Sequence, residues 1–304
     1  MNLFLFGLAL FSLSQSANLI RIAQAPVEVI GFWRLLGAGL VMICLCLKKQ
    51  NRIWPRSISK RTTAAAILSG ILFFAHLWTF SFAAQTATIA NSMIIFAANP
   101  LFTALASLFF FKEKIETRMI FVYLLAFAGL YQLLHDRISI SDLSNLGNWS
   151  ALASAALYSG YILLGARARK ELPNLSFSWL IYLIAAFLFF ATGTLREVLW
   201  TPYPILTWLA ILGTIALPTL LGHALFTYLL KYLNVNWMSC GKLLEPALSA
   251  FVAFLLFSEN PSRETYWAFA LTSLAGLLLF APWKSKAAKA KNTAILQDPI
   301  ERPN

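Results

Sequence analysis

The stretch Gly241-Lys-Leu-Leu-Glu-Pro-Ala-Leu-Ser-Ala-Phe-Val-Ala-Phe-Leu-Leu-Phe-Ser-Glu259 carries two opposite charges and a proline into an otherwise apolar run. Lys242 and Glu245 are three residues apart, so they share one face if the run is helical. Ionisable side chains inside a membrane span are costly and rare, which makes them candidates for function. The stretch therefore predicts a membrane helix that carries part of a functional site.

The composition of the whole chain agrees with a membrane protein. Of the 304 residues, 59% are apolar and only 12% are charged, whereas a soluble domain carries about 25% charged residues. The net charge of +12 is concentrated between apolar runs, which is typical of a cytoplasmic membrane face and disfavours a nucleic-acid partner. The three cysteines have no metal-like spacing, so we interpret them as small buried apolar residues and expect neither a metal site nor a disulfide framework.

Apolar runs long enough to cross a membrane recur along the chain. A spanning helix needs about 20 apolar residues. Ten such runs occur at roughly 2–20, 27–47, 63–84, 88–111, 118–135, 147–166, 175–195, 204–230, 236–257 and 264–283. The first lacks the basic start of a signal peptide, so we expect a retained helix. The predicted fold is all-α, with ten transmembrane helices.

The distribution of basic residues predicts the orientation. With both termini in the cytoplasm, most of the 24 Lys and Arg residues lie on the cytoplasmic side, as the positive-inside rule requires. Four basic residues lie on the opposite side under this arrangement: Arg21, Arg137, Arg196 and Arg263. We therefore expect a multi-pass protein with both termini cytoplasmic.

The two halves of the chain resemble each other. A shift of 146 residues places Asn99-Pro100 on Glu245-Pro246 and Glu113 on Glu259. Five spans per half is an odd number, so the second half must enter the membrane inverted, as in many transporters. This predicts a first five-helix repeat over 1–140, a second over 141–284, and a disordered cytoplasmic tail over 285–304.

These features together resemble the EamA-type transporters of the drug/metabolite transporter superfamily. The resemblance covers about residues 3–283. It rests on the five-plus-five plan, the arginine of Phe32-Trp33-Arg34-Leu35-Leu36-Gly37-Ala38, and the two proline–glutamate spacings. It implies a carrier of the bacterial inner membrane for small metabolites, often an exporter of amino acids or related compounds. Asn99 stands where the second half has Glu245, which disfavours a scheme with two symmetric acids.

Glu245 is the acid that the predicted spans place nearest to mid-membrane. A nearby cation favours its charged form and burial its neutral form, so it could bind a substrate or exchange a proton. Lys242, one turn earlier, could share that role. The alternative is that Lys242 and Glu245 form a structural ion pair.

Further candidates are polar or aromatic residues within the spans. Arg34 could pair with a substrate carboxylate or with Glu245, and His76 and His223 lie at matched positions where they could bind substrate or relay protons. Pro100 and Pro246 free backbone carbonyls and are candidate hinges, or simple packing kinks. The other candidate lining residues are Gln15, Trp78, Asn91, Asn99, Tyr158 and Ser249.

The expected function is secondary transport by alternating access, with a small organic solute as substrate and protons as a candidate coupling ion. An uncoupled facilitator is the main alternative within this class. The chain has no His-Glu-x-x-His, Gly-x-Ser-x-Gly or phosphate-loop motif, so we expect no enzyme activity and no cofactor. Two other classes stay open: a membrane enzyme acting on a lipid-like substrate, and a non-transporting scaffold.

Overall fold

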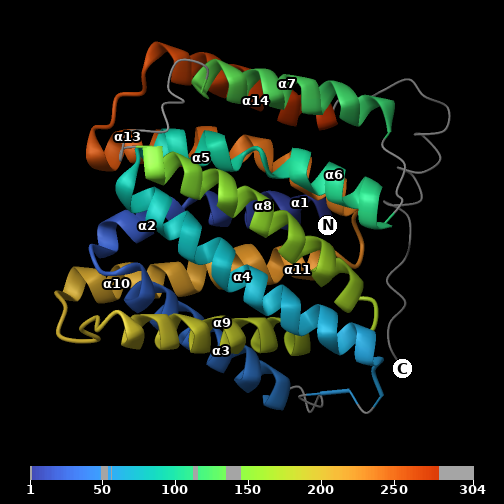
Figure 1. The fold of residues 1–304 in the computed structure, drawn as a ribbon, viewed down its shortest axis with the longest axis vertical. Helices are drawn as coiled ribbons and strands as arrows, with labels where there is room; N and C mark the ends of the chain where they lie inside the picture. Colours follow the sequence, from blue (N-terminus) through green and yellow to red (C-terminus); the bar gives the residue numbers. More distant parts are fainter. Residues whose placement is uncertain (1, 49–53, 56, 112–115, 135–144, 281–304) are drawn as a thin grey trace.

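The computed structural model describes residues 2–48, 54–55, 57–111, 116–134 and 145–280, and these residues contain helices and no strand (Figure 1). The elements in chain order are α1 Asn2–Ser14, α2 Ser16–Ala23, α3 Val27–Lys48, α4 Lys60–Thr86, α5 Ile89–Phe96, α6 Asn99–Phe111, α7 Thr117–Leu134, α8 Asn145–Ala168, α9 Asn174–Leu195, α10 Ile205–Thr214, the π-helix η1 Ile215–Ala224, α11 Leu225–Leu229, α12 Val235–Gly241, the 3-10 helix η2 Lys242–Leu244, α13 Glu245–Phe257 and α14 Arg263–Phe280.

Eight helical segments of the described chain are long and apolar enough to cross a membrane. They are Asn2–Ala23, Val27–Lys48, Lys60–Thr86, Ile89–Phe109, Leu146–Ala168, Asn174–Leu195, Ile205–Leu229 and Val235–Phe257. Thr117–Gln132 forms a shorter apolar helix, and α14 begins with the charged residues Arg263 and Glu264. The all-helical membrane fold is thus confirmed, while the count of ten spans stays a prediction.

The helices lie side by side in one bundle. α7 packs on α14 along one edge, and α3 packs on α9 along the opposite edge (Figure 1). Between them α4 packs on α8, and α1 packs on η1. Large apolar side chains such as Phe109, Phe187 and Phe251 are exposed on the outside of the bundle, where lipid would cover them. The repeat boundary at 140/141 and the tail over 285–304 lie outside the described residues.

Close helix packing gives a stability prediction at Gly31 on α3. A Cβ at this position would lie 2.4 Å from Cε1 of Phe189 on α9. Because inserting a methyl group into a packed interface costs about 1–3 kcal/mol, we expect Gly31→Ala to lower the melting temperature of the detergent-purified protein. Gly7→Ala is the control, since no atom of another described segment lies within 4 Å of a Cβ there. Equal melting temperatures for the two variants would contradict the packing of α3 on α9.

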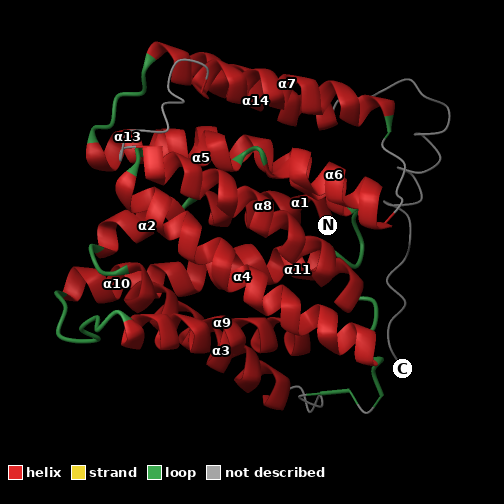
Figure 2. Ribbon diagram, in the orientation of Figure 1, coloured by secondary structure: helices red, strands yellow, loops and turns green. Residues whose placement is uncertain are grey.

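Two membrane segments are interrupted at the prolines that the sequence analysis singled out. Between α5 and α6 the helix breaks at Ala97–Ala98, seen as a green turn in Figure 2, and α6 then begins with Asn99 and Pro100. Proline cannot donate to the carbonyl four residues earlier. Asn99 Nδ2 donates to that carbonyl, the oxygen of Phe96, at 3.0 Å. The asparagine side chain thus replaces the hydrogen bond that the proline removes.

At the corresponding break before Pro246, a different hydrogen bond satisfies the free carbonyl. α12 passes into the 3-10 turn η2, and α13 begins with Glu245 and Pro246. The carbonyl of Lys242, which Pro246 cannot bond, accepts instead from the backbone N–H of Glu245. This 3-10 turn holds Lys242 and Glu245 on the inner face, where both side chains are buried.

Two further interruptions lie in segments that the sequence analysis treated as regular spans. The first segment breaks at Gln15, between α1 and α2. The other break is the π-helix η1, which contains Pro218. Here Thr219 Oγ1 donates at 2.7 Å to the carbonyl of Thr214, four residues before the proline. The hydroxyl oxygen of Thr219 is thereby directed toward the inside of the bundle, where Arg34 binds it.

Candidate functional site

A small cavity of about 20 Å³ lies among the interrupted segments. It is lined by Leu13, Ser16, His76, Leu77, Phe80, Phe96, Tyr158, His223, Lys242 and Glu245. Every one of these residues is buried. A cavity needs roughly 10–15 Å³ to hold one water molecule, so the centre of the protein is closed around a space of about that size. Five of the predicted site residues meet here: His76, Tyr158, His223, Lys242 and Glu245.

Lys242 and Glu245 form a buried ion pair at one wall of the cavity. Lys242 Nζ donates to Glu245 Oε1 at 2.6 Å. Three aromatic rings surround the ammonium group: Nζ lies 4.8 Å from the ring centroid of Tyr158, 5.4 Å from that of Phe226 and 5.5 Å from that of Phe96. Cation–π attraction is strongest where the cation has lost its water. Glu245 and the three rings therefore surround the ammonium group of Lys242 with groups that attract a cation.

The two predicted histidines face each other across the cavity, with 6.1 Å between ring centroids. His76 Nδ1 lies 2.8 Å from Ser154 Oγ, and that hydroxyl donates to the carbonyl of His76. Because the hydroxyl has one proton, this arrangement makes Nδ1 the donor and leaves Nε2 of His76 as an acceptor. His223 Nδ1 is buried and has no hydrogen-bond partner within the described residues.

Other polar atoms beside the cavity are also unsatisfied within the described chain. The hydroxyl groups of Tyr158 and Tyr161 are buried and make no hydrogen bond to any described residue. Buried polar groups are nearly always bonded to protein or water, so unsatisfied ones call for an explanation. A bound solute or water molecules would satisfy these atoms together with His223 Nδ1.

Arg34 lies next to the cavity and is fully buried. Its Nε donates to Thr219 Oγ1 at 2.7 Å, and its Nη1 donates to Ser16 Oγ at 3.3 Å. Nη2 has no partner, and no carboxylate among the described residues pairs with this side chain. Arg34 therefore does not pair with Glu245 in this structure, because Glu245 binds Lys242. A buried cation with a free donor is suited to bind an anionic group.

Five predicted residues lie away from the cavity. Asn99 bonds the backbone at the break before α6. Trp78 Nε1 donates to Glu28, and Gln15 Nε2 donates to Ser14. Asn91 lies near the start of α5 at one end of the bundle, and the carbonyl of Ser249 accepts from Asn18. A functional role for each of the five stays a prediction.

Several residues that the fold brings to the centre were not predicted from the sequence. Ser16, Thr219 and Phe226 contact the charged groups, yet each is an ordinary residue in an apolar run. Pro218 was a usable signal, because a proline in a predicted span exposes a carbonyl and the following threonine can bond it. Glu28 was also overlooked; it is buried in the first turn of α3, where it binds Trp78 and Arg196.

An all-helical bundle of membrane-length segments that closes around buried lysine, glutamate, arginine and histidine side chains defines a multi-pass membrane protein with an occluded polar centre. The chain belongs to the EamA-like transporter family, whose model matches residues 1–134 and 145–281. This family is part of the drug/metabolite transporter superfamily, so the resemblance drawn from the sequence is confirmed.

A search of the curated proteins finds no match to this chain. Among the solved structures, 29 chains match. One of them, described as "Crystal structure of protein", superposes with a TM-score of 0.73 and covers 90% of this chain and 94% of that chain at 19% identity. At this identity the likeness concerns the fold alone.

Proposed function

We propose that this protein is a secondary transporter that exports an amino acid or a related metabolite across the bacterial inner membrane by alternating access. The observation that carries the proposal is the water-sized cavity, which Lys242, Glu245 and two histidines line among interrupted helices, with Arg34 next to it. A closed polar centre of this kind is suited to an occluded state between two open ones.

The chemistry of the site suits a zwitterionic solute. Arg34 has a free Nη2 donor and Lys242 a movable ammonium group, so either can bind a carboxylate. Glu245 and the rings of Phe96 and Tyr158 can bind an ammonium group. A solute that enters must displace Lys242 from Glu245 or share the carboxylate with it. The freed carboxylate is the group that could exchange a proton with the solute, which makes protons the candidate coupling ion.

The way helices pair supports the inverted repeat. In such a repeat, each contact between the halves either joins two counterparts or has a mirrored contact elsewhere. The counterparts α3 and α9, and α7 and α14, pack together, and the contact of α5 with α13 is mirrored by that of α6 with α12. The contact of α4 with α8 is mirrored by that of η1 with α1. The two segments matched by the family model also have nearly equal lengths.

The breaks at Pro100 and Pro246 support a hinge role, because both lie at the start of half-helices in segments that contribute Phe96 and Glu245 to the cavity lining. A helix interrupted there can swing one half while the other stays packed. The positive-inside rule supports the orientation: described basic residues such as Lys60, Lys170 and Lys231 lie at one end, and few lie at the other. Both termini are then cytoplasmic.

Counterflow in sealed proteoliposomes tests this function. Vesicles loaded with one unlabelled amino acid at high concentration are diluted into a trace of the same radiolabelled amino acid, and the panel covers acidic, basic, aliphatic and aromatic members. We expect transient, saturable accumulation of at least one label above protein-free vesicles. No accumulation for any member, with protein that elutes as a single folded species and melts cooperatively, would contradict the proposal. Flux requires two compartments separated by a sealed membrane, so the protein in detergent solution is the control in which no flux is expected.

A further inference from the structure

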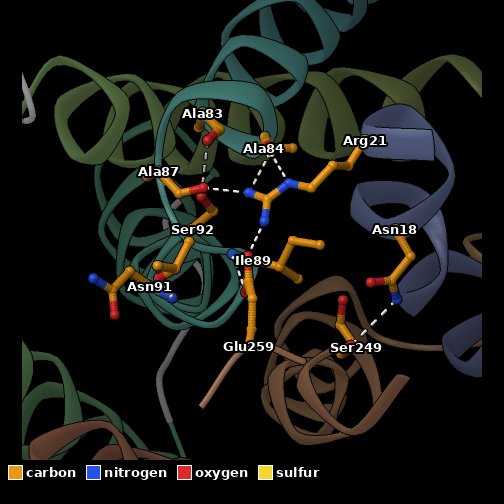
Figure 3. Close-up of polar contacts among 11 residues, drawn as sticks. Asn18, Arg21, Ala83, Ala84, Ala87, Ile89, Asn91, Ser92, Ser249 and Glu259 are labelled. Carbon is orange, nitrogen blue, oxygen red and sulfur yellow. Dashed lines mark hydrogen bonds and ion pairs between the residues drawn. The ribbon is translucent and has the colours of Figure 1, made fainter. Parts of the chain in front are cut away.

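Arg21 joins α2 to the carboxyl end of α4. It lies in the last turn of α2. Its Nε and Nη2 donate to the carbonyl of Ala84 at 3.0 and 2.7 Å, and Nη2 also donates to the carbonyl of Ala87 (Figure 3). Carbonyls at the end of a helix have no partner within it and attract a cation. One guanidinium group therefore closes the end of α4 against α2.

Glu259 joins the same point to the end of α13. Its Oε1 forms an ion pair with Arg21 Nη1, and its Oε2 accepts at 3.1 Å from the backbone N–H of Ile89, the first residue of α5. Glu259 follows Ser258, which ends α13 in the left-handed conformation with φ 54°. The Arg21–Glu259 pair thus ties three parts of the fold together: α2, the turn between α4 and α5, and the end of α13 (Figure 3).

A line of polar residues leads from this ion pair to the central cavity. Asn18 Nδ2, one turn before Arg21, donates at 3.2 Å to the carbonyl of Ser249 on α13 (Figure 3). Asn18 Oδ1 and Ser249 Oγ are buried without a partner in the described chain. We call this contact the α2–α13 seam; it comprises Ser16, Asn18 and Arg21 on one side and Glu245, Ser249 and Glu259 on the other.

The seam separates two spaces. At its inner end, Ser16 and Glu245 line the closed cavity of about 20 Å³. At its outer end, Glu259 lines a surface hollow of about 320 Å³ together with Thr88, Asn91 and Asn260. Polar atoms that are buried between packed membrane helices without a hydrogen-bond partner are unfavourable. They become favourable when water or a polar solute fills the seam.

We propose that the α2–α13 seam is the outer gate of the transporter and that the Arg21–Glu259 ion pair holds it closed. This proposal rests on the proposed function. It assigns the route by which solute passes between the central cavity and the external hollow. Opening separates α2 from α13, hydrates Asn18 and Ser249, and leaves the Lys242–Glu245 pair in contact with the outside. The opposite end of the bundle then has to be closed.

Labelling of a cysteine in the seam tests the gate without any transport measurement. The parent carries Ser249→Cys in a chain whose Cys44, Cys46 and Cys240 are replaced by alanine. Right-side-out membrane vesicles are treated with the membrane-impermeant reagent trimethylammonium-ethyl methanethiosulfonate, and the rate of labelling is measured. We expect Arg21→Gln to raise that rate at least tenfold. Glu259→Gln should raise it less, because the amide oxygen still accepts from Ile89.

The matched control is Glu171→Gln. Glu171 accepts from the backbone N–H and hydroxyl of Ser59 at 2.8 and 3.0 Å, at the other end of α4, and this N–H holds the pKa of the carboxyl below its usual range. Its removal breaks a carboxylate contact of similar kind, so labelling from outside should stay within twofold of the parent. Rates within twofold of the parent for both Arg21→Gln and Glu259→Gln would overturn the gate. So would faster labelling only in inside-out vesicles.

A cross-link provides a second test, in which one protein is compared with itself before linking, after linking and after cleavage of the linker. Arg21→Cys and Glu259→Cys are combined with Ser249→Cys. A short bifunctional thiol reagent links positions 21 and 259. Labelling by the impermeant reagent is then measured at position 249. We expect the linked protein to lose outside labelling at position 249, and cleavage of the linker to restore it. Unchanged labelling in the linked protein would overturn the proposal. Flux in counterflow with an unaffected seam would leave the transporter function in place and reject the gate alone.

Discussion

Glu245→Gln is expected to abolish counterflow and to lower the free energy of unfolding by about 3–5 kcal/mol, because it leaves the ammonium group of Lys242 buried without its partner. Lys242→Met should have a comparable effect, since it leaves a buried carboxylate. Proteoliposomes measure the first quantity, and thermal melting of the purified protein measures the second. Lys231→Met is the control, because Lys231 is exposed and belongs to no ion pair that the described residues show.

Loss of stability alone would not distinguish a structural ion pair from a transport site. The double variant Lys242→Met/Glu245→Leu makes this distinction. Replacing a buried ion pair with apolar residues of similar volume is neutral, or stabilising by about 1–4 kcal/mol. We therefore expect the double variant to melt at or above the parent temperature and to show no counterflow. A double variant that transports at the parent rate would assign the pair a structural role and remove it from the mechanism.

Arg34→Met is expected to change the stability little and to reduce transport strongly. Arg34 is buried and no carboxylate of the described chain pairs with it, so its loss removes the cost of burying a charge along with the hydrogen bonds to Thr219 and Ser16. We expect the free energy of unfolding to change by no more than about 1 kcal/mol. Flux of an amino acid should fall roughly 10- to 100-fold, since a charge-assisted hydrogen bond to the solute contributes about 1.5–3 kcal/mol.

The solute itself provides the control for Arg34. An amino acid amide keeps the ammonium group and lacks the carboxylate. Arg34→Met should therefore exchange the amide at nearly the same rate as the parent protein does. Arg34→Lys keeps the charge and loses the planar fork of donors, and an intermediate loss is expected. If acid and amide respond equally to Arg34→Met, then Arg34 does not bind the carboxylate and holds Thr219 and Ser16 in place instead.

Much of the fold could be predicted because membrane helices depend on local sequence. The length of apolar runs decides where spans lie, and proline interrupts a helix wherever it stands because it lacks the N–H. The breaks before Pro100 and Pro246 followed from this rule, and Lys242 and Glu245 were placed on one face by their spacing alone. The π-helix around Pro218 obeyed the same rule and could have been found.

The site was predicted less completely, because its neighbours come from distant segments. Tyr158 was a candidate, yet its position against Lys242 depends on how α8 packs, and Phe96 and Phe226 resemble any other aromatic residue of a span. Asn91 and Trp78 matched the pattern of lining residues but project toward other contacts.

The sequence by itself determined that this is a helical membrane protein of the drug/metabolite transporter type, that charges enter the apolar run at Lys242 and Glu245, and that helices break beside them. These features depend on hydropathy and on backbone hydrogen bonding within a few residues. Only the tertiary structure decided that Glu245 binds Lys242 while Arg34 binds Thr219, and that Arg21 meets Glu259 at the end of the α2–α13 seam. Such contacts depend on which helix faces pack together, and helical periodicity alone does not specify that.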